Sequence, residues 1–302
     1  MSPKSHHFNP QVYLRQFTNP ASRKDLWQYD LRQGTVSRSS PKASGCEDFY
    51  HSFELKDDGR DDASLEQSFH SIENKLPKLF ETLRHKRPLL EDNWLTLFLF
   101  AALQRTRCPK ALRSTQDGLS KVYQHAYEIM KHSPSFSASM KEKGLDPEAI
   151  RKADISVTAD RGTTLLTLLA ANADGSLVKT FNRMKWTFLV APPGHYFYTS
   201  DDPVCCWADR DPKSPFHAAV GPANSDAEVT LPLSRRACAF ASWSKKSSTL
   251  YTDASSGQVE AVNYRTAMNG FHFLYGPTND SALLSLVKRR AEIRQQPPPP
   301  KP

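Results

Sequence analysis

The residues best suited to chemistry are two adjacent histidines near the N-terminus, His6 and His7. An imidazole can bind a metal ion or move a proton near neutral pH. Because neighbouring side chains of an extended segment point to opposite sides, one ring should face inward and the other outward. We interpret both as candidate catalytic residues, and His7 also as a candidate metal ligand. The alternative is that they are surface or capping residues near a fraying chain end.

A second group of suitable residues lies in a segment with helical periodicity. Glu66, His70 and Glu73 are four and three positions apart, so their side chains should follow one edge of a helix. Carboxylate and imidazole groups in this arrangement suit a divalent metal ion, and we predict Glu66 and Glu73 as ligands. The alternative is a solvated helix flank close to Lys75 and Lys78.

A third carboxylate and two arginines complete the hypothesis. Asp201 follows a predicted strand within Ser200-Asp201-Asp202-Pro203, where it could hold a metal ion or simply form a turn. We assign it as a fourth metal ligand. Arg15 and Arg107 are predicted to neutralise a phosphate group, although Arg107 could instead complement the dipole of the helix that it ends.

The elements that must position these residues change along the chain. Residues 1–60 predict an N-terminal hairpin with loops, because 26–29 alternates like a strand and 32–34 supplies a turn. Residues 61–135 have helical periodicity, with a first helix bent at Pro77, a core helix from Glu91 and a third helix over 119–129. Between 144 and 180 the pattern does not distinguish helix from strand.

The second half of the chain is mostly β in pattern. Residues 180–276 contain several strand-like runs, among them a predicted hairpin that joins 185–190 to 195–199 through Pro192-Pro193-Gly194. A last helix covers 279–294. We therefore predict one α+β domain over 1–294, in which the N-terminal hairpin and helical middle region pack with a mostly antiparallel sheet. Residues 295–302 predict a disordered proline-rich tail.

Composition excludes several classes of protein. Hydrophobic residues make up 38% of the 302-residue chain, which is typical of globular proteins. The longest apolar run, 94–103, is too short for a membrane span, and no secretory signal follows Met1. Five widely spaced cysteines without a CxxC pair suggest reduced thiols in the cytoplasm. GxGxxG, GxxxxGK, GxSxG and HExxH motifs are absent, which disfavours the corresponding nucleotide-binding, hydrolase and protease families.

The order of several short motifs resembles a known bacterial family, "domain of unknown function 4238". The motifs are His6-His7 with Pro10, Tyr13-Leu14-Arg15 with Phe17, Glu47-Asp48-Phe49-Tyr50, Glu66 with Ile72-Glu73, Gln104 to Arg107 with Pro109, Trp186, Thr199-Ser200-Asp201 with Pro203, and Pro232-Leu233. The resemblance covers about residues 4 to 275 and implies one homologous unit. It implies no reaction, as the name of the family indicates.

These residue types lead to one functional hypothesis and one alternative. The hypothesis is a metal-dependent phosphodiester hydrolase, similar to a nuclease, that uses Mg, Mn or Zn held by His7, Glu66, Glu73 and Asp201. The net charge of +8 permits nucleic acid as a partner. The alternative is a non-catalytic module, of the kind found in bacterial defence, that binds nucleic acid or protein. In that case the histidines and glutamates form a buried hydrogen-bonded network.

Overall fold

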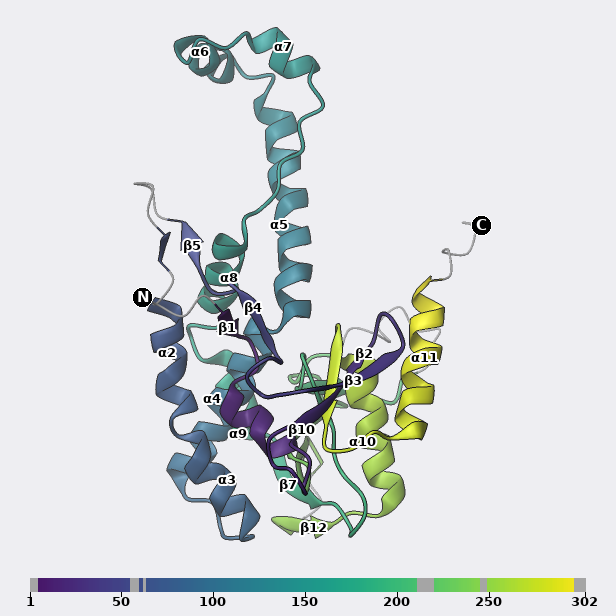
Figure 1. Cartoon of the computed structure of the whole chain (residues 1–302). Helices are drawn as coiled ribbons and strands as arrows, with labels where there is room; N and C mark the ends of the chain where they lie inside the picture. Colours follow the sequence, from purple (N-terminus) through teal and green to yellow (C-terminus); the bar gives the residue numbers. More distant parts are fainter. Residues whose placement is uncertain (1–4, 55–59, 62–63, 211–219, 245–248, 296–302) are drawn as a thin grey trace.

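The protein combines helices with mostly antiparallel strands, and the predicted α+β class is confirmed (Figure 1). The computed structural model describes residues 5–54, 60–61, 64–210, 220–244 and 249–295. The predicted proline-rich tail falls outside these residues from position 296 onward. Within the described ranges, no helix is both long and apolar enough to span a membrane.

A five-stranded sheet forms the centre of the molecule. Its strand order is β12-β7-β11-β10-β9, and all neighbours are antiparallel except β12 and β7. The strands are β7 (Lys185–Val190), β9 (Cys205–Trp207), β10 (Glu228–Ser234), β11 (Ala237–Ser242) and β12 (Tyr251–Asp253). Phe188 and Leu189 are neighbours on β7 but belong to different hydrophobic clusters. Alternation along the strand thus buries both faces of this sheet.

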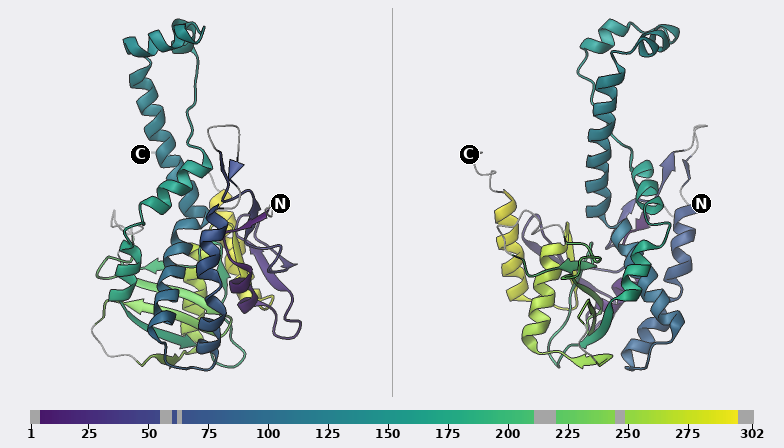
Figure 2. Two further views of the ribbon diagram at one scale, coloured as in Figure 1. Left: turned by 90° about the vertical axis from the view of Figure 1, so that its left-hand side faces the viewer. Right: turned by 180° about the vertical axis from the view of Figure 1, so that it is seen from behind.

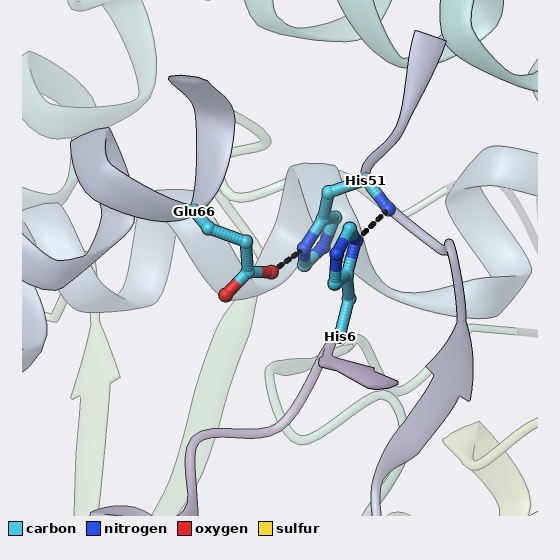
Figure 3. Close-up of side chains that lie close together, drawn as sticks. All are labelled: His6, His51 and Glu66. Carbon is cyan, nitrogen blue, oxygen red and sulfur yellow. Dashed lines mark hydrogen bonds and ion pairs between the residues drawn. The ribbon is translucent and has the colours of Figure 1, made fainter. Parts of the chain in front are cut away.

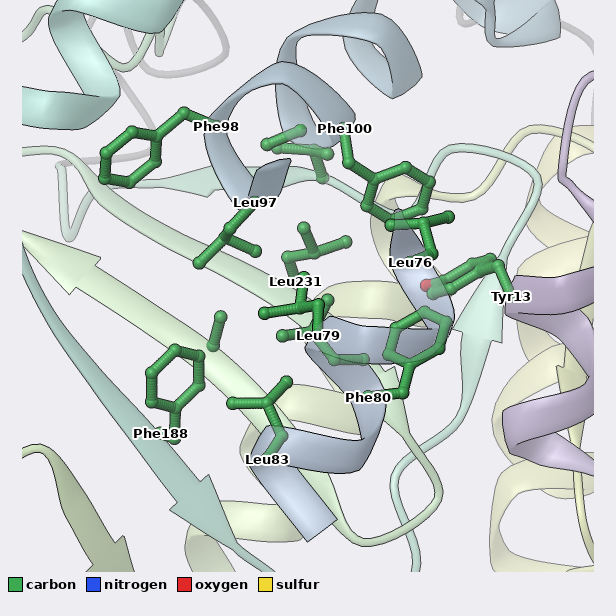
Figure 4. Packing of buried hydrophobic residues seen from close by; sticks show 14 of the residues in the cluster. Tyr13, Leu76, Leu79, Phe80, Leu83, Leu97, Phe98, Phe100, Phe188 and Leu231 are labelled. Atoms are coloured by element: carbon green, nitrogen blue, oxygen red, sulfur yellow. The ribbon is translucent and has the colours of Figure 1, made fainter. Parts of the chain in front are cut away.

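Helices cover the two faces of the central sheet (Figure 2). On one face, Leu79 and Phe100 from two helices pack with Phe188 and Leu231 from the strands (Figure 4). On the opposite face, Val259 packs with the other side of the sheet. The helices concerned are α3 (Leu76–Arg84), α4 (Glu91–Arg107) and α10 (Ser256–Asn269).

The N-terminal hairpin belongs to a second, four-stranded sheet of order β3-β2-β13-β8. Its register pairs Tyr29 with Val36, which confirms the predicted hairpin. Tyr29 and Leu274 pack beneath Leu283 of the C-terminal helix. The elements are β2 (Leu26–Asp30), β3 (Thr35–Ser39), β8 (Thr199–Ser200), β13 (Phe273–Gly276) and α11 (Ser281–Gln295).

Two details of the predicted elements were wrong. Strand β7 pairs with β11 and β12, whereas Thr199 and Ser200 pair with β13 of the other sheet, so the predicted hairpin does not form. The turn at Pro192-Pro193-Gly194 is followed by chain that crosses between sheets. The first predicted helix is also two helices, because α2 (Ser64–Glu73) ends before α3, and Pro77 occupies the first turn of α3, where its missing N–H is tolerated.

The ambiguous region between 144 and 180 is helical. Its first part, together with the preceding helices, forms an arm that extends away from the sheets (Figure 1). The arm consists of α5 (Pro109–Met130), α6 (Pro134–Glu142) and α7 (Pro147–Lys152). The next helices return to the body: α8 (Arg161–Ala170) packs on α5, and α9 (Ser176–Arg183) packs on α4.

The N-terminal segment joins the helices to both sheets. The Tyr13 hydroxyl lies 2.6 Å from the Thr199 hydroxyl and donates to the Pro232 carbonyl at 2.6 Å. Asn9 donates its side-chain amide to the Ser200 carbonyl at 2.7 Å. The segments are β1 (Ser5–His7), α1 (Gln11–Leu14), the 3-10 turn η1 (Arg15–Phe17), β4 (Cys46–Asp48), β5 (Phe53–Glu54) and β6 (Arg60–Asp61).

Candidate functional site

The two N-terminal histidines lie on a short strand and face opposite ways. Strand β1 pairs antiparallel with β4, so that His6 is opposite Glu47. His6 is fully buried, whereas His7 is partly exposed. This is the arrangement that an extended pair of residues requires.

A tight turn brings β4 against β1. Gly45 has a φ of +64°, and a Cβ at this position would lie 2.8 Å from the Cβ of Asn9. The Asn9 N–H donates to the Gly45 carbonyl at 3.0 Å. Only glycine accepts both the left-handed backbone and this close approach. The turn therefore fixes the strand that leads to His51.

His6, His51 and Glu66 form a compact cluster (Figure 3). One nitrogen from each ring and one carboxylate oxygen lie within 4.8 Å of one another, and no other such group occurs among the described residues. The two rings stack at 5.7 Å between centroids. Nδ1 of His51 forms a hydrogen bond with Oε1 of Glu66. Phe69 closes the cluster, with its ring edge-on to His51.

The protonation states in this cluster favour a cation. Burial lowers the pKa of His51 to about 4, despite the opposing effect of Glu66. Burial alone would raise the pKa of Glu66, but the hydrogen bond from His51 and the charge of Arg107 lower it. At pH 7 the cluster therefore contains a neutral imidazole beside an ionised carboxylate. These are the forms that ligate metal ions.

Two ring nitrogens in the cluster have no hydrogen-bond partner. They are Nε2 of His6 and Nε2 of His51, and both are buried. The backbone N–H of His51 donates to Nδ1 of His6 at 3.0 Å. Because Nδ1 accepts this bond, the proton of a neutral His6 ring is on Nε2. In this tautomer Nε2 cannot bind a metal ion. A cation at that nitrogen would need the proton to move to Nδ1.

An ion pair between buried Arg107 and partly exposed Glu73 also contacts Phe69. Nη1 of Arg107 donates to Oε1 of Glu73 at 2.8 Å, and its guanidinium lies 5.2 Å above the Phe69 ring. Nε of Arg107 donates to the Gln104 side chain at 3.2 Å. Nη2 of Arg107 is buried without a partner. Arg107 thus keeps one donor available beside the cluster.

Glu66 connects the buried cluster to a cavity of about 320 Å³, which His6 and His51 themselves do not line. Glu66, Glu73, His7, His70 and Arg15 are among its lining residues. A ring nitrogen of His7 donates to the Lys42 carbonyl, which leaves its other nitrogen as an acceptor when the ring is neutral. Burial lowers the pKa of His7, although Glu66 and Glu73 act in the opposite direction. His7 therefore presents a neutral imidazole to this cavity.

Residues 5–280 match the family described as "Protein of unknown function (DUF4238)". The chain belongs to this family. No curated protein and no solved structure matches the chain. The DUF4238 match includes the whole cluster and both strands that position it, which confirms the resemblance inferred from the short motifs.

The DUF4238 chain does not bring Asp201 into the cluster. The two carboxylate oxygens of Asp201 accept hydrogen bonds from the backbone N–H groups of Phe271, His272 and Phe273, at 2.7, 2.6 and 3.2 Å. Burial raises the pKa of Asp201 to about 6, and the Asp202 charge contributes. Asp201 holds the turn before β13, so the alternative of a turn-forming carboxylate describes its contacts.

The remaining predicted site residues do meet. His7, Glu66, Glu73 and Arg15 line one cavity, with Arg107 bonded to Glu73 beneath it. His6 is fully buried and does not line this cavity. Glu66 and Glu73 contact His51 and Arg107, not the lysines expected for a solvated helix flank.

Sequence reasoning missed His51 as a member of the cluster. Its position in the sequence has no helical or motif spacing to either histidine or to Glu66. The available signal was its place directly after Glu47-Asp48-Phe49-Tyr50, one of the stretches that carried the resemblance. The antiparallel pairing of β1 with β4 brings that stretch beside His6.

Proposed function

We propose that this DUF4238 protein is a divalent-metal-dependent phosphodiester hydrolase whose ion is held by His6, His51 and Glu66. The observation that carries the proposal is the convergence of these three ligand types within 4.8 Å in buried surroundings. Two imidazoles and one carboxylate are a ligand set used by hydrolytic zinc sites, which keep a further position open. The sequence predicted His7, Glu66, Glu73 and Asp201 as ligands. The proposed set keeps only Glu66 and adds His6 and His51.

The cavity above the cluster supports the choice of a phosphate ester. Arg15 lines it, and so does Glu73, whose carboxylate is paired with the buried Arg107. Arginine matches the geometry of phosphate oxygens and stays charged at any physiological pH. His7, neutral and at the cavity wall, can accept a proton from an attacking water. A bound divalent ion would lower the pKa of that water and stabilise charge in the transition state.

Nucleic acid is the polymeric phosphodiester that the net charge of +8 favours, and we include it in the proposal. The five cysteines are all free, in agreement with a reducing compartment such as the cytoplasm.

Thermal unfolding of chelator-treated protein with Mg, Mn, Zn or Ca tests the proposal. An ion at about 100 times its Kd should stabilise the folded state by about 2.7 kcal/mol. Glu66→Gln should abolish this response. His70→Gln is the matched control, because His70 is exposed and lines the same cavity but lies outside the cluster. The responsive ion should also support cleavage of bis(p-nitrophenyl) phosphate by the parent and by His70→Gln.

A second function is supported by a different observation, the hydrogen bond from the His51 N–H to Nδ1 of His6. This bond suits a permanent network that fixes the N-terminal segment on the helices of a non-catalytic binding module. Under that alternative no ion would raise the Tm of the parent, whereas Glu66→Gln would simply unfold at a lower temperature. That result would remove the hydrolase proposal.

A further inference from the structure

A second cavity, of about 620 Å³, lies between the N-terminal segment, α3 and the β10–β11 turn. It is lined by an unusual concentration of cationic side chains: Arg15, Arg23, Arg84, Lys86, Arg235 and Arg236. Among the described residues that line it, none is acidic. We call this space the basic cavity.

The positive charges of the basic cavity are largely uncompensated. In the described part of the chain, no carboxylate pairs with any of its five arginines, and only Lys86 has an acidic partner, Asp253 at 3.1 Å. Like charges held together without counter-ions repel one another, which costs folding free energy. Burial lowers the pKa of Arg235, and the charges of Arg23 and Arg84 lower it further. A bound anion would remove this cost.

The arginines divide into fixed and available groups. Nη1 of Arg236 donates to the Pro192 carbonyl at 2.7 Å, and Nη1 of Arg235 lies 3.4 Å from the Thr18 carbonyl. These bonds hold both guanidinium groups at the cavity wall. Arg23 and Arg84 are exposed; Arg23 lies in the loop before β2, and Arg84 is the last residue of α3. The cavity therefore has a preorganised cationic wall with further donors beside it.

Two of the cationic residues of this cavity have an unfavourable backbone conformation. Among the described residues, three that are not glycine have positive φ, and two of them line this cavity, Arg23 at 55° and Lys86 at 50°. The left-handed conformation is unfavourable for a residue that has a Cβ atom. Such strain tends to occur at binding sites, where the surrounding structure maintains it.

The remaining lining sets the size and type of the ligand. Phe80, Leu83 and Leu233 form an apolar floor, and the first two are seen in the core beside Leu79 (Figure 4). A volume of this size accommodates a small organic molecule, whereas a long polymer would need an open groove. An apolar floor beneath several arginines suits a molecule with an organic portion and more than one phosphate.

We propose that the basic cavity binds a nucleotide-sized ligand with two or more linked phosphate groups. Arginine forks pair with phosphate oxygens through two parallel hydrogen bonds, and several forks in one cavity select a chain of phosphates over a single one. Arg15 lines both this cavity and the one lined by His7, Glu66 and Glu73. The two cavities therefore share one wall residue, and binding of the ligand does not depend on the proposed metal centre.

Isothermal titration of the chelator-treated full chain with tripolyphosphate, adenosine triphosphate, inorganic phosphate, citrate and a single-stranded oligothymidylate tests the proposal. Tripolyphosphate and the nucleotide should bind at least about tenfold more tightly than phosphate or citrate. The double variant Arg23→Gln with Arg84→Gln should lose about tenfold or more of that affinity. The matched control is Arg113→Gln with Arg289→Gln, which removes the same charge from exposed positions outside the cavity.

Three results would overturn the proposal: equal affinity for citrate, equal loss in the control variant, or binding of the oligonucleotide alone. The first would show a general anion site, the second a diffuse charge effect and the third a nucleic-acid surface. Because chelator is present throughout, the outcome is independent of metal binding by His6, His51 and Glu66. Glu66→Gln should retain full affinity for tripolyphosphate.

Discussion

The backbone N–H of His51 donates to Nδ1 of His6, while Nδ1 of His51 is hydrogen-bonded to Glu66. This relationship joins two histidines that are 45 positions apart. It also sets a condition for metal binding, because a ring nitrogen that ligates an ion must have lost its proton. His6 can bind through Nε2 only if the proton moves to Nδ1 and the bond from the His51 N–H is broken.

This condition predicts a change of tautomer. On addition of the ion that raises the Tm, the ¹⁵N signals of His6 should change from the Nε2–H to the Nδ1–H pattern, and the His51 amide proton should shift. Long-range ¹H–¹⁵N correlation spectra of histidine-labelled protein measure both. Unchanged His6 signals with a saturating ion would show that the ion binds elsewhere.

The pairing of fully buried Arg107 with partly exposed Glu73 predicts a large effect on stability. Glu73→Ala should lower the free energy of unfolding by about 3 to 5 kcal/mol, because it leaves the guanidinium buried without its partner. Urea unfolding measures the change. Glu81→Ala is the control, since Glu81 is exposed on the neighbouring helix, and it should change stability by less than about 0.5 kcal/mol. A small effect of Glu73→Ala would mean that Arg107 reaches solvent.

The local part of this structure could be predicted from the sequence. Helix periodicity correctly placed α4, and strand alternation with a turn signal placed the hairpin of β2 with β3, because both depend on neighbours close in the chain. The opposite orientations of His6 and His7 followed from the geometry of an extended segment. The shared helix edge of Glu66 and Glu73 also followed from local periodicity, and both side chains line the same cavity.

The non-local part could not be predicted in this way. His51 meets His6 through the pairing of β1 with β4, which no spacing in the sequence reveals. Likewise, 195–199 continues toward the second sheet because Thr199 and Ser200 pair with β13. Asp201 has the residue type and position of a ligand, but three backbone N–H groups from 271–273 use its oxygens. Long-range pairing decided each of these cases.

The pKa of His51 predicts how stability depends on pH. Burial lowers this pKa from 6.5 to about 4, so between these values only the unfolded chain binds the proton. As pH falls below 6.5, protonation of His51 in the unfolded chain lowers the free energy of unfolding, by up to about 1.4 kcal/mol per pH unit. Above pH 6.5 this loss is absent. Urea unfolding from pH 7.5 to 4.5 should show a shallower slope for His51→Gln than for the parent. The variant of exposed His195, His195→Gln, should keep the parental slope. Equal slopes for all three proteins would contradict a neutral, buried His51.

Asp201→Asn should separate a structural from a ligating role for this carboxylate. The variant amide places N–H groups against backbone donors, which should cost about 1 to 3 kcal/mol of unfolding free energy. The Tm increase caused by the bound ion should persist, because Asp201 lies outside the cluster. Thermal scans with and without the ion measure both quantities. Loss of the ion response in a folded Asp201→Asn protein would restore Asp201 as a ligand.

Arg23 should show that stability and ligand binding oppose each other in the basic cavity. Arg23→Gly removes the backbone strain at a φ of 55°, whereas the greater flexibility of glycine in the unfolded chain opposes this gain. The net effect should be a stabilisation of the fold by about 0.5 to 1 kcal/mol. Arg23→Gln keeps the strained backbone but removes the same charge. Both variants should bind tripolyphosphate more weakly than the parent and to a similar extent, whereas only the glycine variant should gain the backbone contribution to Tm. A glycine variant that binds like the parent would mean that the positive φ serves local folding and that the Arg23 charge does not reach the ligand.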